Sequence, residues 1–185
     1  MLTRRMFTAS AAASILASPA IANSSTWIPW KYRPQEVDVN PDLKAGESHV
    51  SKDDFFLYWT LGNGRARRYG IATGDQGRNY TGVLTIRRKA EWPSWRPTAN
   101  MVQLEPHLYG PDQQGITGGH PANPMGSRAL YLHDNSGRDP YYRIHGTMQP
   151  ETIGQSFSSG CVRLTNDHVA ELYAMVPVNT HVYIF

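Results

Sequence analysis

Short β-prone runs interrupted by glycine and proline restrict this chain to folds made mainly of strands and turns. The sequence distributes 16 Gly and 13 Pro between such runs. Residues 55–60 form one run, Gly62-Asn63-Gly64 a turn, and residues 67–73 a second run. Because an Asn-Gly pair adopts positive φ at little cost, this segment predicts a β-hairpin. Further strands are expected at residues 82–89, 128–133, 141–145 and 182–185.

One segment near the C-terminus changes to the period of a helix. Asn166 is its expected N-cap, and Pro177 stops it. The apolar residues that share one face are Val169, Leu172, Tyr173 and Val176. Residues 98–104 predict at most a short helix, and residues 110–126 a long loop of the kind that often serves function. We therefore expect a mostly-β fold, a β-sandwich or partly open barrel with one or two short helices.

The first 22 residues have the pattern of an export leader. Arg4 and Arg5 precede a mildly apolar stretch that is too short to span a bilayer, which needs about 20 apolar residues. Ala20-Ile21-Ala22 supplies a small-x-small cleavage site, and the segment around Arg4 and Arg5 resembles a twin-arginine signal. We expect residues 1–22 to be removed and the protein to work in the periplasm or cell envelope without a stable membrane anchor. The alternatives are the general secretory route and a short N-terminal arm of a cytoplasmic protein.

Length and charge predict one folded domain with no nucleic-acid partner. Residues 23–52 have little periodicity and are expected to be an extended lead-in, which leaves residues 53–185 as the domain. Without the two arginines of the leader, Lys and Arg together number 16 against 15 acidic residues. This near balance, with no basic run interleaved with aromatic residues, argues against nucleic-acid binding.

Cys161 is the single cysteine of the chain. Exported proteins usually carry cysteines in pairs, so a solitary one is a buried small residue, an intermolecular bridge or a reactive thiol. His145 ends an expected strand, and an imidazole near a thiol stabilises the thiolate and later protonates a leaving amine. The amides of Ser159, Gly160 and Cys161 converge if the chain turns tightly there, and would then hold an oxyanion. These residues indicate nucleophilic acyl transfer.

Residues 145–173, HGTMQPETIGQSFSSGCVRLTNDHVAELY, resemble the active-site signature of the L,D-transpeptidase catalytic domain, or YkuD domain. That signature is His-Gly, a loop, Ser/Thr-x-Gly-Cys, an aliphatic residue, Arg, and an Asn before a helix. The segments GNGRARRYGIATG, RKAEWPSWRPTANM and NPMGSRALYL also resemble the family. The resemblance therefore covers residues 53–185 and implies that they form a catalytic domain.

The resemblance implies a cysteine acyltransferase that acts on peptidoglycan stem peptides. Cys161 would attack the carbonyl that follows the L-centre of diaminopimelate in a tetrapeptide stem, release D-Ala and leave a thioester. His145 would act as base and then as acid, and the backbone around Ser159 and Gly160 would form the oxyanion hole. The acyl group would pass to an amine of another stem and give a 3–3 cross-link.

The resemblance also implies residues that bind substrate. Arg163 would orient a substrate carboxylate, with Gly146 and Thr147 as further substrate-binding positions. Many members of the family carry His where Ser159 stands. Ser159 cannot act as a second imidazole, but its backbone N–H is unaffected, so the oxyanion role is retained.

Other acceptors are open at this point: water, a free D-amino acid, or a lysine of an envelope lipoprotein. A non-catalytic peptidoglycan-binding module is the alternative from another class. No cofactor is expected, and no metal, because the sequence has no His-x-x-x-His or Cys-x-x-Cys pair. His120 is expected to be an exposed loop residue, and His133 and His168 are expected at the surface.

Overall fold

The computed structural model describes residues 28–75 and 79–185, so the expected leader, residues 1–22, lies outside the described residues. Strands dominate this part of the chain. They are β1 (Gln35–Asp38), β2 (Ser48–Ser51), β3 (Phe56–Gly62), β4 (Arg65–Gly70), β5 (Thr73–Gly74), β6 (Gly82–Glu91), β7 (Arg128–His133), β8 (Arg143–His145), β9 (Ser156–Ser158), β10 (Val162–Arg163) and β11 (His181–Ile184). The helices are α1 (Ala99–Leu104), α2 (Pro106–Tyr109) and α3 (Asn166–Met175), with 3-10 turns η2 (Trp30–Tyr32) and η3 (Pro150–Thr152).

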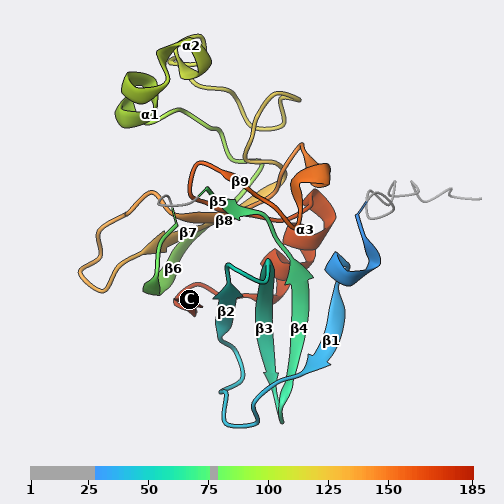
Figure 1. Ribbon diagram of the computed structural model, residues 1–185. Helices are drawn as coiled ribbons and strands as arrows, with labels where there is room; N and C mark the ends of the chain where they lie inside the picture. Colours follow the sequence, from blue (N-terminus) through green and yellow to red (C-terminus); the bar gives the residue numbers. More distant parts are fainter. Residues whose placement is uncertain (1–27, 76–78) are drawn as a thin grey trace, which may run out of the picture.

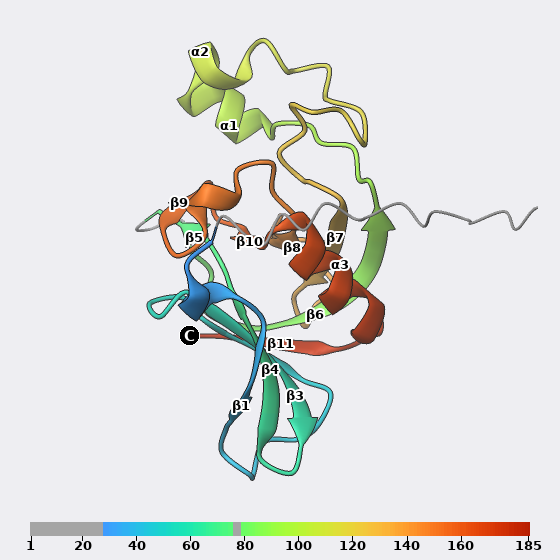
Figure 2. The same ribbon diagram turned by 90° about the vertical axis from the view of Figure 1, so that its right-hand side faces the viewer.

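Most of the described strands join one strongly bent sheet. Its nine strands run in the order β1-β4-β3-β2-β11-β6-β7-β8-β10, and β5 pairs with β9 in a small second sheet. Figures 1 and 2 show the β1–β4 half and the β6–β8 half as two layers set at an angle, joined by β11. The expected mostly-β fold with a few short helices is confirmed.

The expected hairpin is β3 and β4, which pair antiparallel. Its turn has φ of 52° at Asn63 and 70° at Gly64, the positive values that an Asn-Gly hairpin turn requires. Residues 23–52, expected to be an extended lead-in, contribute two strands to the sheet. β1 pairs with β4. β2 pairs with its neighbour in sequence, β3, and in parallel with β11, near the C-terminus.

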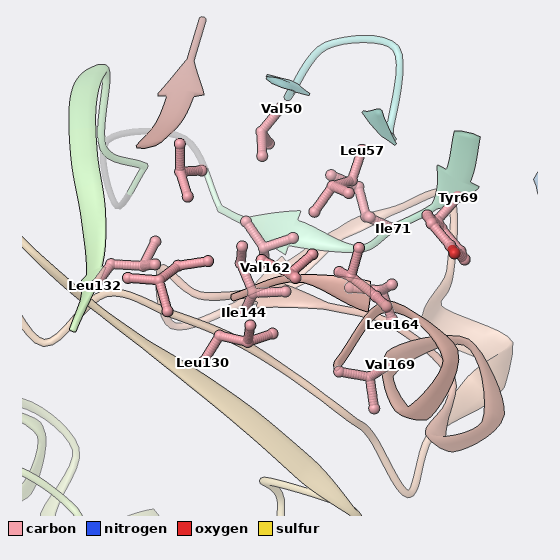
Figure 3. Packing of buried hydrophobic residues seen from close by; sticks show 14 of the residues in the cluster. Val50, Leu57, Tyr69, Ile71, Leu130, Leu132, Ile144, Val162, Leu164 and Val169 are labelled. Carbon is pink, nitrogen blue, oxygen red and sulfur yellow. The ribbon is translucent and has the colours of Figure 1, made fainter. Parts of the chain in front are cut away.

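The hydrophobic core fills the space between the two halves of the sheet. Figure 3 shows side chains from β2, β3, β7, β8, β10 and α3 converging there, among them Val50, Leu57, Leu130, Ile144 and Val169. These five residues are fully buried. Burying them stabilises the fold by about 1.5–3 kcal/mol per side chain. The strands that carry the functional residues are thus anchored to the core by alternate side chains.

The C-terminal helix α3 begins with Thr165 as N-cap, and not with Asn166 as predicted. The Thr165 side chain accepts a hydrogen bond from His168 N, while Asn166 Oδ1 accepts one from Ser127 N at 2.9 Å. Asn166 is therefore used to hold the start of β7, which displaces the cap by one residue. The helix ends before Pro177, as expected.

Residues 92–127, here called the α1–α2 excursion, leave the sheet between β6 and β7. Figures 1 and 2 show α1 and α2 standing away from the body of the molecule, and none of their residues is buried. Trp92 N donates to Ser127 O at 2.8 Å, so the two ends of the excursion are joined. The Tyr109 hydroxyl, at the end of α2, lies 2.9 Å from Ser159 Oγ. The excursion therefore contacts the chain two residues before Cys161.

Candidate active site

β8 and β10 pair in parallel, which brings the His145 and Cys161 parts of the sequence signature next to each other. Val162 lies opposite Ile144, and Arg163 lies opposite His145. Val162 and Ile144 are fully buried in the core. Because side chains alternate along a strand, Cys161, Arg163 and His145 share the other face. The predicted nucleophile and base therefore lie on one face of two neighbouring strands.

Cys161 is a partly exposed free thiol at the start of β10. Its Sγ donates to Tyr141 O at 3.7 Å. Burial raises the pKa of the Cys161 thiol, and the backbone N–H and the charge of Arg143 act in the opposite direction. In this geometry the resting sulfur is the protonated thiol.

His145 is 4% exposed, and its Nδ1 donates to Gly146 O at 2.6 Å. Burial lowers the pKa of the His145 imidazole to about 3, and the charge of Arg163 adds to this effect. The ring is therefore neutral at pH 7, as a general base must be. There is no direct hydrogen bond between the described side chains of His145 and Cys161. Cys161 comes two residues before Arg163, the residue that lies opposite His145, so Cys161 and His145 are diagonal neighbours across the two strands.

The turn before Cys161 is built by Ser158 and Gly160. Ser158 Oγ donates to Cys161 O and accepts from Gly160 N at 3.1 Å. Gly160 has φ of 131°, a conformation that side-chain-bearing residues rarely adopt. Gly160 N–H is engaged by Ser158 Oγ, so in this geometry it is not free to bind an oxyanion. Ser158 was not predicted from the sequence.

Two arginines flank the thiol on its face of the sheet. Arg163 Nε is buried with no partner among the described residues, and its guanidinium lies 5.8 Å from the Phe157 ring centroid. Arg143 forms two contacts of 2.6 Å with Asp139. The sequence analysis missed Arg143. It lies two residues before His145 in β8, and because side chains alternate along a strand, the two share a face.

The other predicted substrate-binding residues have structural contacts. A Cβ at Gly146 would lie 2.3 Å from Asn166 Oδ1, so no larger residue fits there without movement. Thr147 is 3% exposed, and its Oγ1 accepts from Gln149 N at 3.0 Å. Their roles in substrate binding stay predictions. Ser159 is exposed and contacts Tyr109 through its hydroxyl.

Three further histidines were considered in the sequence analysis, and of these His133 lies on β7 on the same face as Arg143 and His145. His120 is exposed, and its Nδ1 accepts from Ala122 N, and His133 is partly exposed. His168 was predicted at the surface but is 3% exposed. Its side chain points from α3 toward β4, with its ring 6.3 Å from that of Tyr69. Across residues 28–75 and 79–185, no group of three or more His, Cys, Asp or Glu comes together to hold a metal ion. Within the same residues no helix has the length and apolar character needed to cross a membrane.

Comparison with known proteins identifies the family. The family model described as the L,D-transpeptidase catalytic domain, YkuD, matches residues 46–184. The chain belongs to this family. The L,D-transpeptidase family is a family of enzymes, and the match includes the β8–β10 face with Cys161 and His145.

Relatives with curated names agree with this membership. A protein of Fuscovulum blasticum, whose name assigns it provisionally to the L,D-transpeptidases, is 30% identical over 94% of this chain and 90% of its own length. The probable L,D-transpeptidase ErfK/SrfK of Escherichia coli is 36% identical over 82% of this chain. The match spans 47% of the length of ErfK/SrfK.

Solved structures support the fold. An L,D-transpeptidase from Mycobacterium smegmatis has a TM-score of 0.52 at 15% identity, over 75% of this chain and 57% of that one. A protein from Brucella melitensis, titled a probable carnitine operon oxidoreductase, has a TM-score of 0.58 at 45% identity, over 85% of this chain and 96% of that one. The present sequence has no glycine-rich phosphate loop that follows a strand and opens a helix, the pattern a dinucleotide-dependent oxidoreductase would carry.

Proposed function

We propose that this L,D-transpeptidase family member forms a thioester between Cys161 and a peptidoglycan stem peptide and then transfers the acyl group to an amine. The observation that carries the proposal is the placement of the single, partly exposed thiol on the same sheet face as the neutral, buried imidazole of His145. The substrate is a tetrapeptide stem that ends in D-Ala. The acceptor amine of a second stem gives a 3–3 cross-link.

The first step follows from the protonation states of the pair. Cys161 loses its proton to His145 as Sγ attacks the carbonyl carbon after the L-centre of diaminopimelate. The amide C–N bond breaks, His145 returns the proton to the leaving D-Ala nitrogen, and a thioester remains. Because Nδ1 already donates to Gly146 O, Nε2 is the nitrogen that accepts the proton. In the second step the acceptor amine attacks the thioester carbonyl and loses a proton to His145. The C–N bond forms as the C–S bond breaks, and His145 returns the proton to the Cys161 sulfur.

The charge that develops on the substrate has partners in the turn and beside it. The amides of Ser159 and Cys161 are proposed to bind the oxyanion of the tetrahedral intermediate. The unpaired Nε of Arg163 is proposed to bind a carboxylate of the stem. Arg143 adds a positive charge that favours the thiolate during attack.

A covalent-adduct experiment tests the nucleophile. The protein without residues 1–22 is incubated with a carbapenem and its intact mass is measured, with Cys161→Ala as the matched control. We expect a single adduct on wild type and none on the variant. An unmodified wild type, or an equal adduct on Cys161→Ala, would refute the assignment.

Product analysis tests the reaction. A disaccharide tetrapeptide is supplied, and the products are identified by mass spectrometry. We expect loss of D-Ala with formation of a 3–3 dimer. A tripeptide without a dimer would assign the acyl group to water, and a tetrapeptide with an exchanged terminal residue would assign it to a free D-amino acid.

We also propose that residues 1–22 direct export to the periplasm or cell envelope. The support is the pair Arg4 and Arg5 ahead of a small-residue cleavage site. Cell fractionation tests this. We expect wild type in the envelope fraction and a variant with both arginines changed to lysine in the cytoplasm; an unchanged distribution of the variant would argue against the twin-arginine route.

A further inference from the structure

A pocket lies away from the thiol, between the N-terminal part of the described chain and α3. Its volume is about 280 Å³, just below the range of about 300–1,000 Å³ that is typical of small-ligand sites. The residues that line it are Trp30, Arg33, Pro34, Arg67, Asp167, His168 and Glu171. They come from η2 and the segment after it, from β4, and from the first turns of α3. None of them belongs to the face that carries Cys161.

Unpartnered polar atoms gather at this pocket. His168 is 3% exposed, yet neither of its ring nitrogens has a partner within the described part of the chain, and Arg33 Nε is likewise buried without one. Buried polar groups in folded proteins nearly always have hydrogen-bond partners. Because both residues line the pocket, their three unsatisfied nitrogens indicate a site that a polar ligand completes.

The charges around the pocket favour a neutral ligand. Arg33 and Arg67 contribute two positive charges, and Asp167 and Glu171 contribute two negative ones. Burial lowers the pKa of His168 to about 4, so its ring is uncharged at pH 7. Arg67 Nε donates to Glu171 Oε1 at 2.8 Å, which neutralises one pair locally. With no net charge, the lining attracts neither an anion nor a cation in preference to a neutral polar molecule.

An exposed indole stands at the rim. Trp30 is 72% exposed, and the guanidinium of Arg33 lies 5.5 Å from its ring centroid. An exposed flat ring beside planar hydrogen-bonding groups suits the two faces of a pyranose, whose C–H face stacks on aromatics and whose hydroxyl and acetamido groups take up hydrogen bonds.

We propose that this pocket is a saccharide subsite that binds an N-acetylated amino sugar. One sugar ring would stack on Trp30 and place its polar groups toward Arg33 and His168. The assignment of this sugar to the glycan strand of the substrate rests on the proposed function; the saccharide site itself rests on the pocket. It would hold the glycan while the stem peptide reaches the Cys161 face.

Binding of chitotetraose, a soluble N-acetylglucosamine tetramer, tests the subsite. The full chain and Trp30→Ala are titrated by calorimetry, with Trp92→Ala as the matched control, since Trp92 is a second exposed indole, on the α1–α2 excursion. We expect wild type and Trp92→Ala to bind alike, and Trp30→Ala to bind about two- to twelvefold more weakly. An excess of inorganic phosphate should not displace the sugar.

No binding by wild type, equal binding by Trp30→Ala, or displacement by phosphate would overturn the subsite. A carbapenem-adduct measurement on the same samples separates the two proposals. Trp30-dependent sugar binding without an adduct would retain the subsite and reject the acyl-transfer proposal. An adduct on every protein without sugar binding would do the reverse.

Discussion

The buried ring of His168 makes the stability of the fold sensitive to acid. In the unfolded chain its pKa returns to 6.5, whereas burial lowers it to about 4 in the folded protein. Between these values the unfolded state binds a proton that the folded state does not. Stability is therefore fully present above pH 6.5 and is lost as the pH falls towards 4.

The size of the loss follows from this difference. Each pH unit between the two pKa values costs about 1.4 kcal/mol, so His168 alone removes about 2 kcal/mol at pH 5. Burial also lowers the pKa of His145, to about 3, so wild type loses further unfolding free energy in acid through this ring. The variant His168→Leu keeps the His145 contribution and removes that of His168, so the difference between the two proteins isolates one ring.

Urea unfolding at pH 7.5 and pH 5 measures the effect. We expect wild type to lose about 2 kcal/mol more unfolding free energy between these pH values than His168→Leu does. His120→Leu, which removes an exposed loop imidazole, should behave as wild type. Equal losses for wild type and His168→Leu would refute the reasoning, because they would show that the His168 ring takes up its proton without unfolding.

Three further predictions concern the active-site face. Alkylation of Cys161 by iodoacetamide should accelerate steadily with pH above neutrality and show no plateau between pH 5 and 7, because burial raises the thiol pKa; a low-pH plateau in the measured rates would mean a preformed thiolate. Tyr109→Phe removes the hydroxyl that contacts Ser159, so hydrogen exchange in residues 92–127 should speed up while the free energy of unfolding stays within about 0.5 kcal/mol. Asn166→Ala leaves Ser127 N without its acceptor and should lower the free energy of unfolding by about 1–3 kcal/mol, measured in urea, with unchanged stability counting against the role given to this contact.

Local sequence signals predicted the elements whose partners are close in the chain. The β3–β4 hairpin follows from the Asn63-Gly64 turn, and the end of α3 follows from Pro177. The strands β1 and β2 were not predicted, because residues 23–52 show little periodicity and part of the pairing is distant: β2 pairs in parallel with β11, more than 100 residues later. The two-residue strands β5 and β10 are likewise defined only by their partners, and no periodicity can develop over such a length.

The residues of the candidate site were likewise predictable only in part. The family signature located Cys161 and His145, and pairing of β8 with β10 places them on one face. Tyr109 could not have been assigned, since its contact with Ser159 depends on the path of residues 92–127 between β6 and β7. The sequence analysis predicted His168 at the surface because histidine is polar, and it gave too little weight to the position of His168 in the helix. It lies in the first turn of α3, whose Val169 and Leu172 face the core.

The α1–α2 excursion leaves and re-enters the sheet at facing positions, since Glu91 at the end of β6 pairs with Arg128 at the start of β7. Its length is thus uncoupled from the register of the strands beneath it, and doubling such a loop costs only about 0.6 kcal/mol of closure entropy. The outer part of the excursion, which carries α1 and α2, can therefore differ in length without shifting the strands. Its last residues cannot, because Met125 is buried and Ser127 N donates to Asn166 Oδ1 at the start of α3.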